Sequence, residues 1–176
     1  MVELQRITTA YSDTQDRMRI TGEATPDETV ELWITQRLLN RLLTHLFTWL
    51  VQQAPEQSNP TMAPQVQAMQ SFAQQAAAAV LQPQPPVVTQ LASKGGLVHS
   101  VDVRSDVHAV RLAFRAGQAM AGVDSFALTL QAQPLRQWLN ILHAQYRLAE
   151  WPLSVWPQWM NESSAALIER PSAVWH

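Results

Sequence analysis

The chain has 176 residues, of which 47% are apolar and 15% charged, and its formal net charge is −2. Its length fits one domain of ordinary size, and its charged fraction lies below the roughly 25% of an average protein. The absence of cysteine excludes disulfides, thiolate metal ligands and a cysteine nucleophile. No apolar run reaches the ~18 residues of a membrane span and the N-terminal residues show no signal peptide, so we expect a cytoplasmic protein without membrane contact.

Three segments near the N-terminus, residues 2–10, 17–23 and 29–35, alternate apolar and polar residues, as half-buried strands do. The simplest arrangement is an antiparallel meander of three strands. From Thr35 the period becomes helical, and Thr35 can cap the helix through its hydroxyl. The helix should end near Gln53, and its apolar stripe consists of Leu39, Leu42, Leu43, Leu46, Phe47 and Leu50.

A second helix is predicted over residues 65–82, because its apolar residues recur at helical spacing among strong helix formers. These residues are Val66, Met69, Phe72, Ala73, Ala76 and Val80. The alanine and glutamine bias leaves open the alternative of a solvated, partly mobile element. The proline-rich segment 82–86 ends the helix.

The second half of the chain repeats the order of the first. Lys94–Gly96 is predicted as a turn, and three alternating segments follow at residues 97–105, 108–116 and 124–132. A helix comes next, with Pro134 in its first turn. Its apolar stripe consists of Leu135, Trp138, Leu139, Leu142, Tyr146 and Ala149.

A shift of 96 residues places Leu32, Leu39 and Leu46 on Leu128, Leu135 and Leu142. We therefore expect an α+β fold of two pseudo-symmetric βββα units, although two amphipathic strand–helix segments also align partly by chance. One such unit buries too little apolar area to be stable alone, so the two should close a common core. The meanders would pack as a sandwich or open barrel with helices at the ends; a single six-stranded sheet with helices on one face is the alternative.

This arrangement makes residues 1–176 one domain, with halves at 1–54 and 96–149. Residues 55–95 form a helical connection and residues 150–176 a tail rich in tryptophan and proline.

No motif predicts catalysis, a metal or a cofactor. His45 and His143 lie on corresponding helices but lack further ligands at metal-binding spacing. His99, Ser100 and Asp102 would point to opposite faces of a strand, so they cannot converge as a triad. We expect a protein that is not an enzyme.

The tail holds four of the seven tryptophans of the chain, namely Trp151, Trp156, Trp159 and Trp175. Such rings either pack back on their own domain or anchor a partner. Together with the low charge, they favour a non-enzymatic interaction or structural module that forms a homodimer.

Two other functions stay open. Arg17, Arg19, Arg111 and Arg115 alternate with core residues on predicted strands, and could form one polar sheet face that binds single-stranded nucleic acid. The low overall basicity disfavours such a partner, and a solvated strand face explains the same pattern. A cleft between the halves could instead bind a small ligand.

Overall fold

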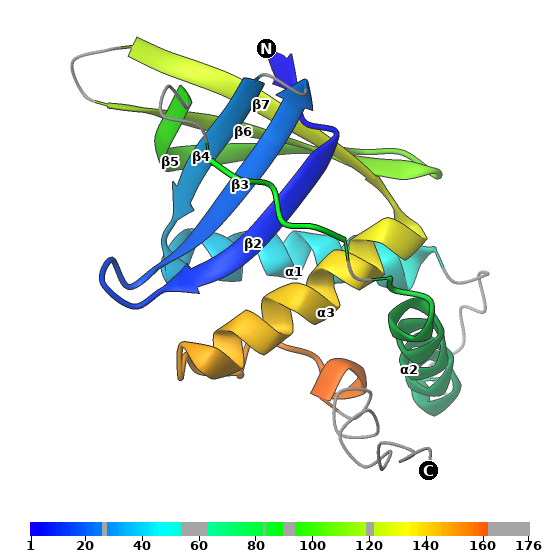
Figure 1. Cartoon of the computed structure of the whole chain (residues 1–176). Helices are drawn as coiled ribbons and strands as arrows, with labels where there is room; N and C mark the ends of the chain where they lie inside the picture. The colour runs from blue at the N-terminus through cyan, green and yellow to red at the C-terminus, as the bar shows by residue number, and fades with distance from the viewer. Residues whose placement is uncertain (26–27, 54–62, 83, 90–93, 119–121, 162–176) are drawn as a thin grey trace, which may run out of the picture.

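Seven strands form one curled sheet, and two long helices lie against its open side (Figure 1). The computed structural model describes residues 1–25, 28–53, 63–82, 84–89, 94–118 and 122–161. The first half of the chain supplies β1 (Val2–Glu3), β2 (Arg6–Ser12), β3 (Arg17–Thr25), β4 (Glu28–Ile34) and α1 (Gln36–Gln52). The remaining elements are α2 (Ala63–Ala79), β5 (Lys94–Ser105), β6 (Ala109–Gln118), β7 (Gly122–Gln131) and α3 (Ala132–Leu148).

The strand order is β1-β7-β6-β5-β4-β3-β2, so the α+β class is confirmed. Of the two predicted arrangements, the sandwich of separate sheets is wrong, and the single curled sheet is a half-barrel. The two antiparallel meanders are present, but they join edge to edge. β4 pairs in parallel with β5 over residues 30–33 and 94–97. β1 pairs in parallel with β7, where Val2 lies opposite Phe126.

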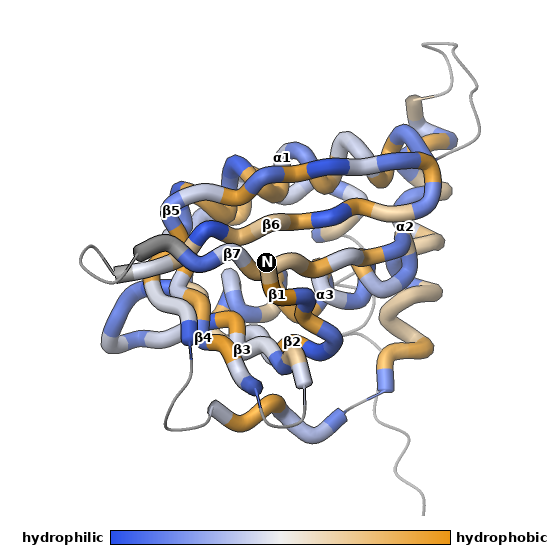
Figure 2. Tube along the Cα trace, turned by 90° about the horizontal axis from the view of Figure 1, so that it is seen from above, coloured by the Kyte–Doolittle hydropathy of each residue, from blue (hydrophilic) through white to orange (hydrophobic). Residues whose placement is uncertain are grey.

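The chain bends between β1 and β2, which lie at opposite ends of the strand order. The Leu4 N–H donates to the Ala127 carbonyl at 2.7 Å, and the next residue, Gln5, donates to Glu23 on β3 at 2.8 Å. The chain thus leaves β7 and joins β3 within two residues, and Figure 2 shows β1 beside β7 at this place. The sheet is therefore closed at one corner and open beyond it, where α3 lies between β2 and β7.

The predicted turn at Lys94–Gly96 is wrong, because these residues begin β5 and pair with β4. Both glycines have positive φ, 118° at Gly95 and 132° at Gly96. A Cβ on Gly95 would lie 2.3 Å from the Glu31 carbonyl oxygen, so this close approach of the two strands requires glycine. The glycine pair indicated a turn by composition, but here it serves parallel pairing.

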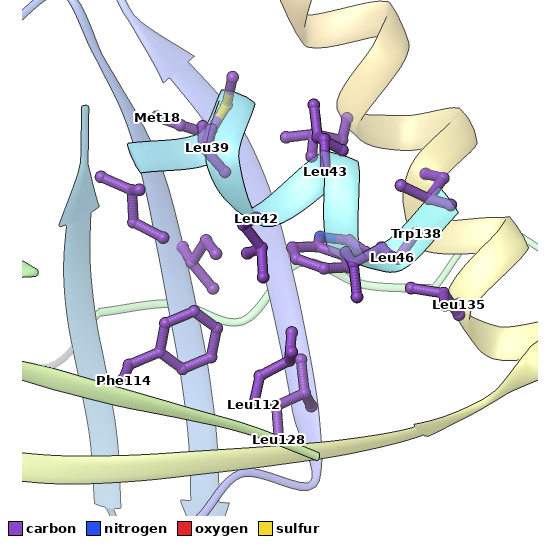
Figure 3. Packing of buried hydrophobic residues seen from close by; sticks show 14 of the residues in the cluster. Met18, Leu39, Leu42, Leu43, Leu46, Leu112, Phe114, Leu128, Leu135 and Trp138 are labelled. Carbon is purple, nitrogen blue, oxygen red and sulfur yellow. The ribbon is translucent and has the colours of Figure 1, made fainter. Parts of the chain in front are cut away.

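The core lies between the concave face of the sheet and the helices α1 and α3 (Figure 3). Thr35 caps α1 as predicted, since its hydroxyl accepts the Leu38 N–H at 3.4 Å, and Gln53 follows the last turn. The two leucines at matching positions of β4 and β7, Leu32 and Leu128, are both buried. None of the described helices is long and apolar enough to cross a membrane.

Candidate functional site

Helix α2 exposes its largest apolar side chains, and it lies at the edge of the molecule in both views (Figures 1 and 2). Met69, Phe72 and Val80 are 50%, 74% and 56% exposed. Ala76 and Ala79 lie on the same side and are exposed as well. The helix is confirmed, but four of the six residues of the apolar stripe that predicted it are left exposed by the described residues, and the other two are partly buried. We call these five residues the outer face of α2.

Helix α2 is held to the body by polar groups on its inner side. Gln70 and Gln74 are buried, and their amide groups donate to the carbonyls of Leu50 on α1 and Arg136 on α3, at 3.2 and 2.9 Å. The Arg136 guanidinium donates back to the side-chain oxygens of both glutamines. It also lies 5.7 Å from the ring centre of Trp159. We call Gln70, Gln74 and Arg136 the polar clamp.

The polar clamp contains a buried cation. Burial lowers the pKa of Arg136, and no carboxylate of the described residues forms an ion pair with it. Its charge is therefore stabilised by the two glutamine oxygens and the indole face of Trp159. The sequence offers no local signal for this cluster, because its members come from two helices some 60 residues apart in the chain.

A groove lies where β2 separates from β7, and its volume is about 740 Å³. One wall is the stretch Gln5–Thr9 along β2, and the other comes from the first turns of α3, including Trp138 and Ile141. Val80, Leu81 and residues 84–86 close one end. The sequence predicted a cleft between the halves only in general terms, and none of its residues was singled out.

Three of the four predicted interface tryptophans are buried within the chain. The exposed fractions of Trp151, Trp156 and Trp159 are 7%, 4% and 4%, whereas Trp175 lies outside the described residues. Their rings meet aromatic rings of β2, α1 and α3 at centroid distances from 4.8 to 5.8 Å, through contacts with Tyr11, Phe47, His143 and Tyr146. These three indoles therefore pack on their own domain.

Most arginines of the predicted arginine face form ion pairs with neighbouring carboxylates. Arg111 donates to Glu3 at 2.7 Å, and Arg115 donates to Asp102 through two nitrogens at 2.8 and 3.1 Å. Arg19 lies 4.0 Å from Glu31 and 5.9 Å from the Trp33 ring centre. Arg17, at the start of β3, is partly buried.

Strands β3 and β6, which carry these arginines, are separated by β4 and β5. Three of the four charges are balanced by neighbouring carboxylates. Such a face offers little net positive field to a phosphate backbone.

The histidines that the structure describes form no common ligand site. His45 is exposed, whereas His143 is buried beside Trp156, and its Nε2 lies 3.0 Å from the side-chain oxygen of Asn161. Burial lowers the pKa of His143, and the nearby Arg147 charge acts in the same direction. His99 faces the Gly117 carbonyl at 3.3 Å, away from any triad with Ser100 and Asp102. Within the described ranges, no group of three or more histidine, aspartate or glutamate residues could hold a metal ion.

No protein-family model, no curated protein and no solved structure matches this chain. The outer face of α2 and the groove beside β2 are therefore the two surfaces from which a function can be inferred.

Proposed function

We propose that the chain is a non-enzymatic interaction module and that two copies associate through the outer face of α2. The observation that carries the proposal is a helix that turns Gln70 and Gln74 inward and its methionine and phenylalanine outward. Exposing Phe72 and Met69 to water is unfavourable, and covering them on a partner removes this cost. Monomeric proteins seldom leave such a contiguous apolar surface free.

The spacing along this face fits a helical partner. Four residues of the outer face continue a regular spacing that starts at Gln65. The intervals of four and three residues are those of a coiled-coil seam, and the series is Gln65, Met69, Phe72, Ala76 and Ala79. The two alanines are small enough to let another helix approach closely. An antiparallel pair of α2 helices would place each Phe72 ring beside the alanines of the other copy.

A second copy is favoured because the surface is neutral. Helix α2 contains no charged residue, so its outer face would meet an identical face without repulsion. A twofold dimer requires that kind of self-complementary patch. A charged partner would gain nothing specific from it.

We also infer that residues 1–54 and 96–149 are two copies of one βββα unit. In support, α1 and α3 each have 17 residues and begin 96 residues apart, at Gln36 and Ala132. The last strand of each half pairs in parallel with the first strand of the other half. Helix α2 has no counterpart in this scheme. It is an addition to the repeated unit, which suits an element devoted to association.

Light scattering on the Phe72→Gln variant tests the dimer. We expect twice the chain mass for the wild type and a single chain mass for Phe72→Gln. The matched control is Val107→Gln, because Val107 is also 74% exposed but lies between β5 and β6. This control should remain dimeric. A wild type that is monomeric at high concentration, or a Phe72→Gln protein that dimerises as the wild type does, would disprove the proposal.

A further inference from the structure

The groove beside β2 is long and follows a strand. Five consecutive residues, Gln5–Thr9, form one wall, which is roughly 17 Å at about 3.3 Å per residue. Its volume of about 740 Å³ lies within the range of roughly 300–1,000 Å³ typical of ligand sites. A cavity of this shape suits an extended chain better than a compact molecule.

The wall formed by β2 has a free hydrogen-bonding edge. Strand β2 is the last strand of the sheet at this end, with β3 on one side only. The Tyr11 N–H points away from β3, because it donates to the Gln145 side chain of α3 at 2.8 Å. Backbone groups alternate along a strand, so the N–H groups of Thr9 and Ile7 point the same way. Outside the β2–β3 ladder, neither of these two N–H groups donates a hydrogen bond to any described residue.

The two ends of the free edge of β2 thus differ in whether their outward N–H groups have a hydrogen-bond partner. At Tyr11 a glutamine side chain satisfies the backbone donor, as proteins commonly do to protect an edge strand. At Ile7 and Thr9 the same edge borders the groove. An unpaired donor that opens into a cavity is a template for another strand.

The remaining walls of the groove are uncharged, and they combine apolar side chains with the amides of Gln82, Gln84 and Gln137. Val80, Leu130 and Ile141 contribute aliphatic side chains, and Pro85 and Pro86 contribute prolines. Arg6 is the charged residue of the lining, but its guanidinium is engaged by Glu23 at 3.1 Å and by the Pro85 carbonyl at 2.9 Å. A ligand with neutral, partly apolar side chains would match these walls.

We propose that this groove binds an extended peptide segment of another protein, which adds a strand to the free edge of β2. The peptide backbone pairs with Ile7 and Thr9, and alternate apolar side chains pack against the α3 wall. Strand addition of this kind combines backbone hydrogen bonds, which give affinity, with side-chain pockets, which give selectivity. An acyl chain or a small apolar molecule would fill the space but leave the N–H groups unpaired.

Fluorescence anisotropy with a labelled peptide, Ac-Thr-Val-Thr-Val-Thr-Val-Thr-amide, tests the proposal on the full chain. Two further peptides carry N-methyl groups, one on every valine and the other on every threonine. Only one set of alternate N–H groups can face β2, so one methylated peptide should bind about tenfold or more weaker and the other as well as the parent. Equal binding of all three peptides would indicate an apolar pocket without strand pairing, and no binding of the parent peptide would remove the site; either result overturns the proposal.

Charge introduced on α3 locates the binding site. Ile141→Lys places an ammonium group in the groove and should weaken binding of the parent peptide about tenfold or more. Leu148→Lys is the matched control, since Leu148 is exposed on the same helix two turns away and does not line the groove. The Phe72→Gln protein should bind as the wild type does, because Phe72 also lies outside the lining. Equal loss in Ile141→Lys and Leu148→Lys would contradict this placement.

Discussion

Replacing Gln70 and Gln74 together by leucine should detach α2, although the exchange makes its inner side more apolar. Simple hydrophobic reasoning predicts the opposite, namely tighter packing. The difference lies in Arg136, whose guanidinium donates to both glutamine oxygens and has no carboxylate partner among the described residues. The double variant would leave a buried cation with only the Trp159 ring beside it.

The expected magnitude follows from two opposing contributions. Removing the partners of a buried charge costs about 3–5 kcal/mol, and the added leucine surface offsets about 1–2 kcal/mol of this cost. The free energy of α2 detachment should therefore fall by roughly 2–3 kcal/mol. A third change, Arg136→Leu, removes the cation itself. The triple variant should therefore recover α2 docking, with a coupling free energy of about 2 kcal/mol or more between the glutamine pair and the arginine.

Amide hydrogen exchange measures the detachment directly. An isolated helix of this length is marginal in water, so α2 should unfold when it detaches. Its amides should exchange roughly 30- to 140-fold faster in the double variant, since 1.4 kcal/mol corresponds to a factor of ten. The amides of β4 should keep their protection, because the curled sheet does not depend on the polar clamp.

The control is Gln75→Leu, on the same helix. Gln75 is partly buried, and its amide reaches Ser71 rather than Arg136, so α2 should stay docked. If the Gln70→Leu/Gln74→Leu protein protects α2 as well as the wild type does, the cation does not need the glutamine oxygens. The reasoning about the polar clamp would then be refuted.

Two further predictions concern the parallel strand junction and the aromatic tail. Gly95→Ala should lower the unfolding free energy by more than about 3 kcal/mol, because its Cβ would clash with the Glu31 carbonyl. Gly96→Ala should lower it by only about 1–3 kcal/mol, since Gly96 has a positive φ but no atom lies within 3.4 Å of the added Cβ. Equal urea midpoints for the two variants would contradict the close approach to Glu31. The pKa of His143 is lowered from 6.5 in the folded chain, so the unfolded chain takes up the proton first and the unfolding free energy should fall as the pH drops below 6.5. His143→Gln should flatten this pH dependence, which is measured by urea unfolding monitored through tryptophan fluorescence. An unchanged slope of the unfolding free energy against pH would exclude His143 as its source.

Much of the fold follows from local periodicity. Alternation predicts the six long strands, because each has one face on the core. The three- and four-residue spacing predicts α1 and α3, and Thr35 and Pro134 lie in the first turns as their chemistry requires. These features depend on neighbours in the sequence, which a single chain displays directly.

Periodicity does not show which strands and helices contact one another. Parallel pairing of β4 with β5 depends on contacts between residues 64 positions apart, and a Gly-Gly pair indicates a turn as readily as a close strand contact. The orientation of α2 reverses the usual rule because Arg136, on another helix, draws two glutamines inward. The groove depends on the bend after Leu4, which joins two ends of the sheet. The tryptophans of the tail could equally have packed inside or outside.

The pairing of Val2 with Phe126 also bears on how the chain folds during synthesis. Phe126 leaves the ribosome more than 120 residues after Val2, so β1 must wait while the two meanders and α1 are made. Until then, the backbone groups of β1 that pair with β7 have no partner strand and are open to other nascent chains. Slow translation beyond residue 126 would lengthen this period, and rapid release would shorten it.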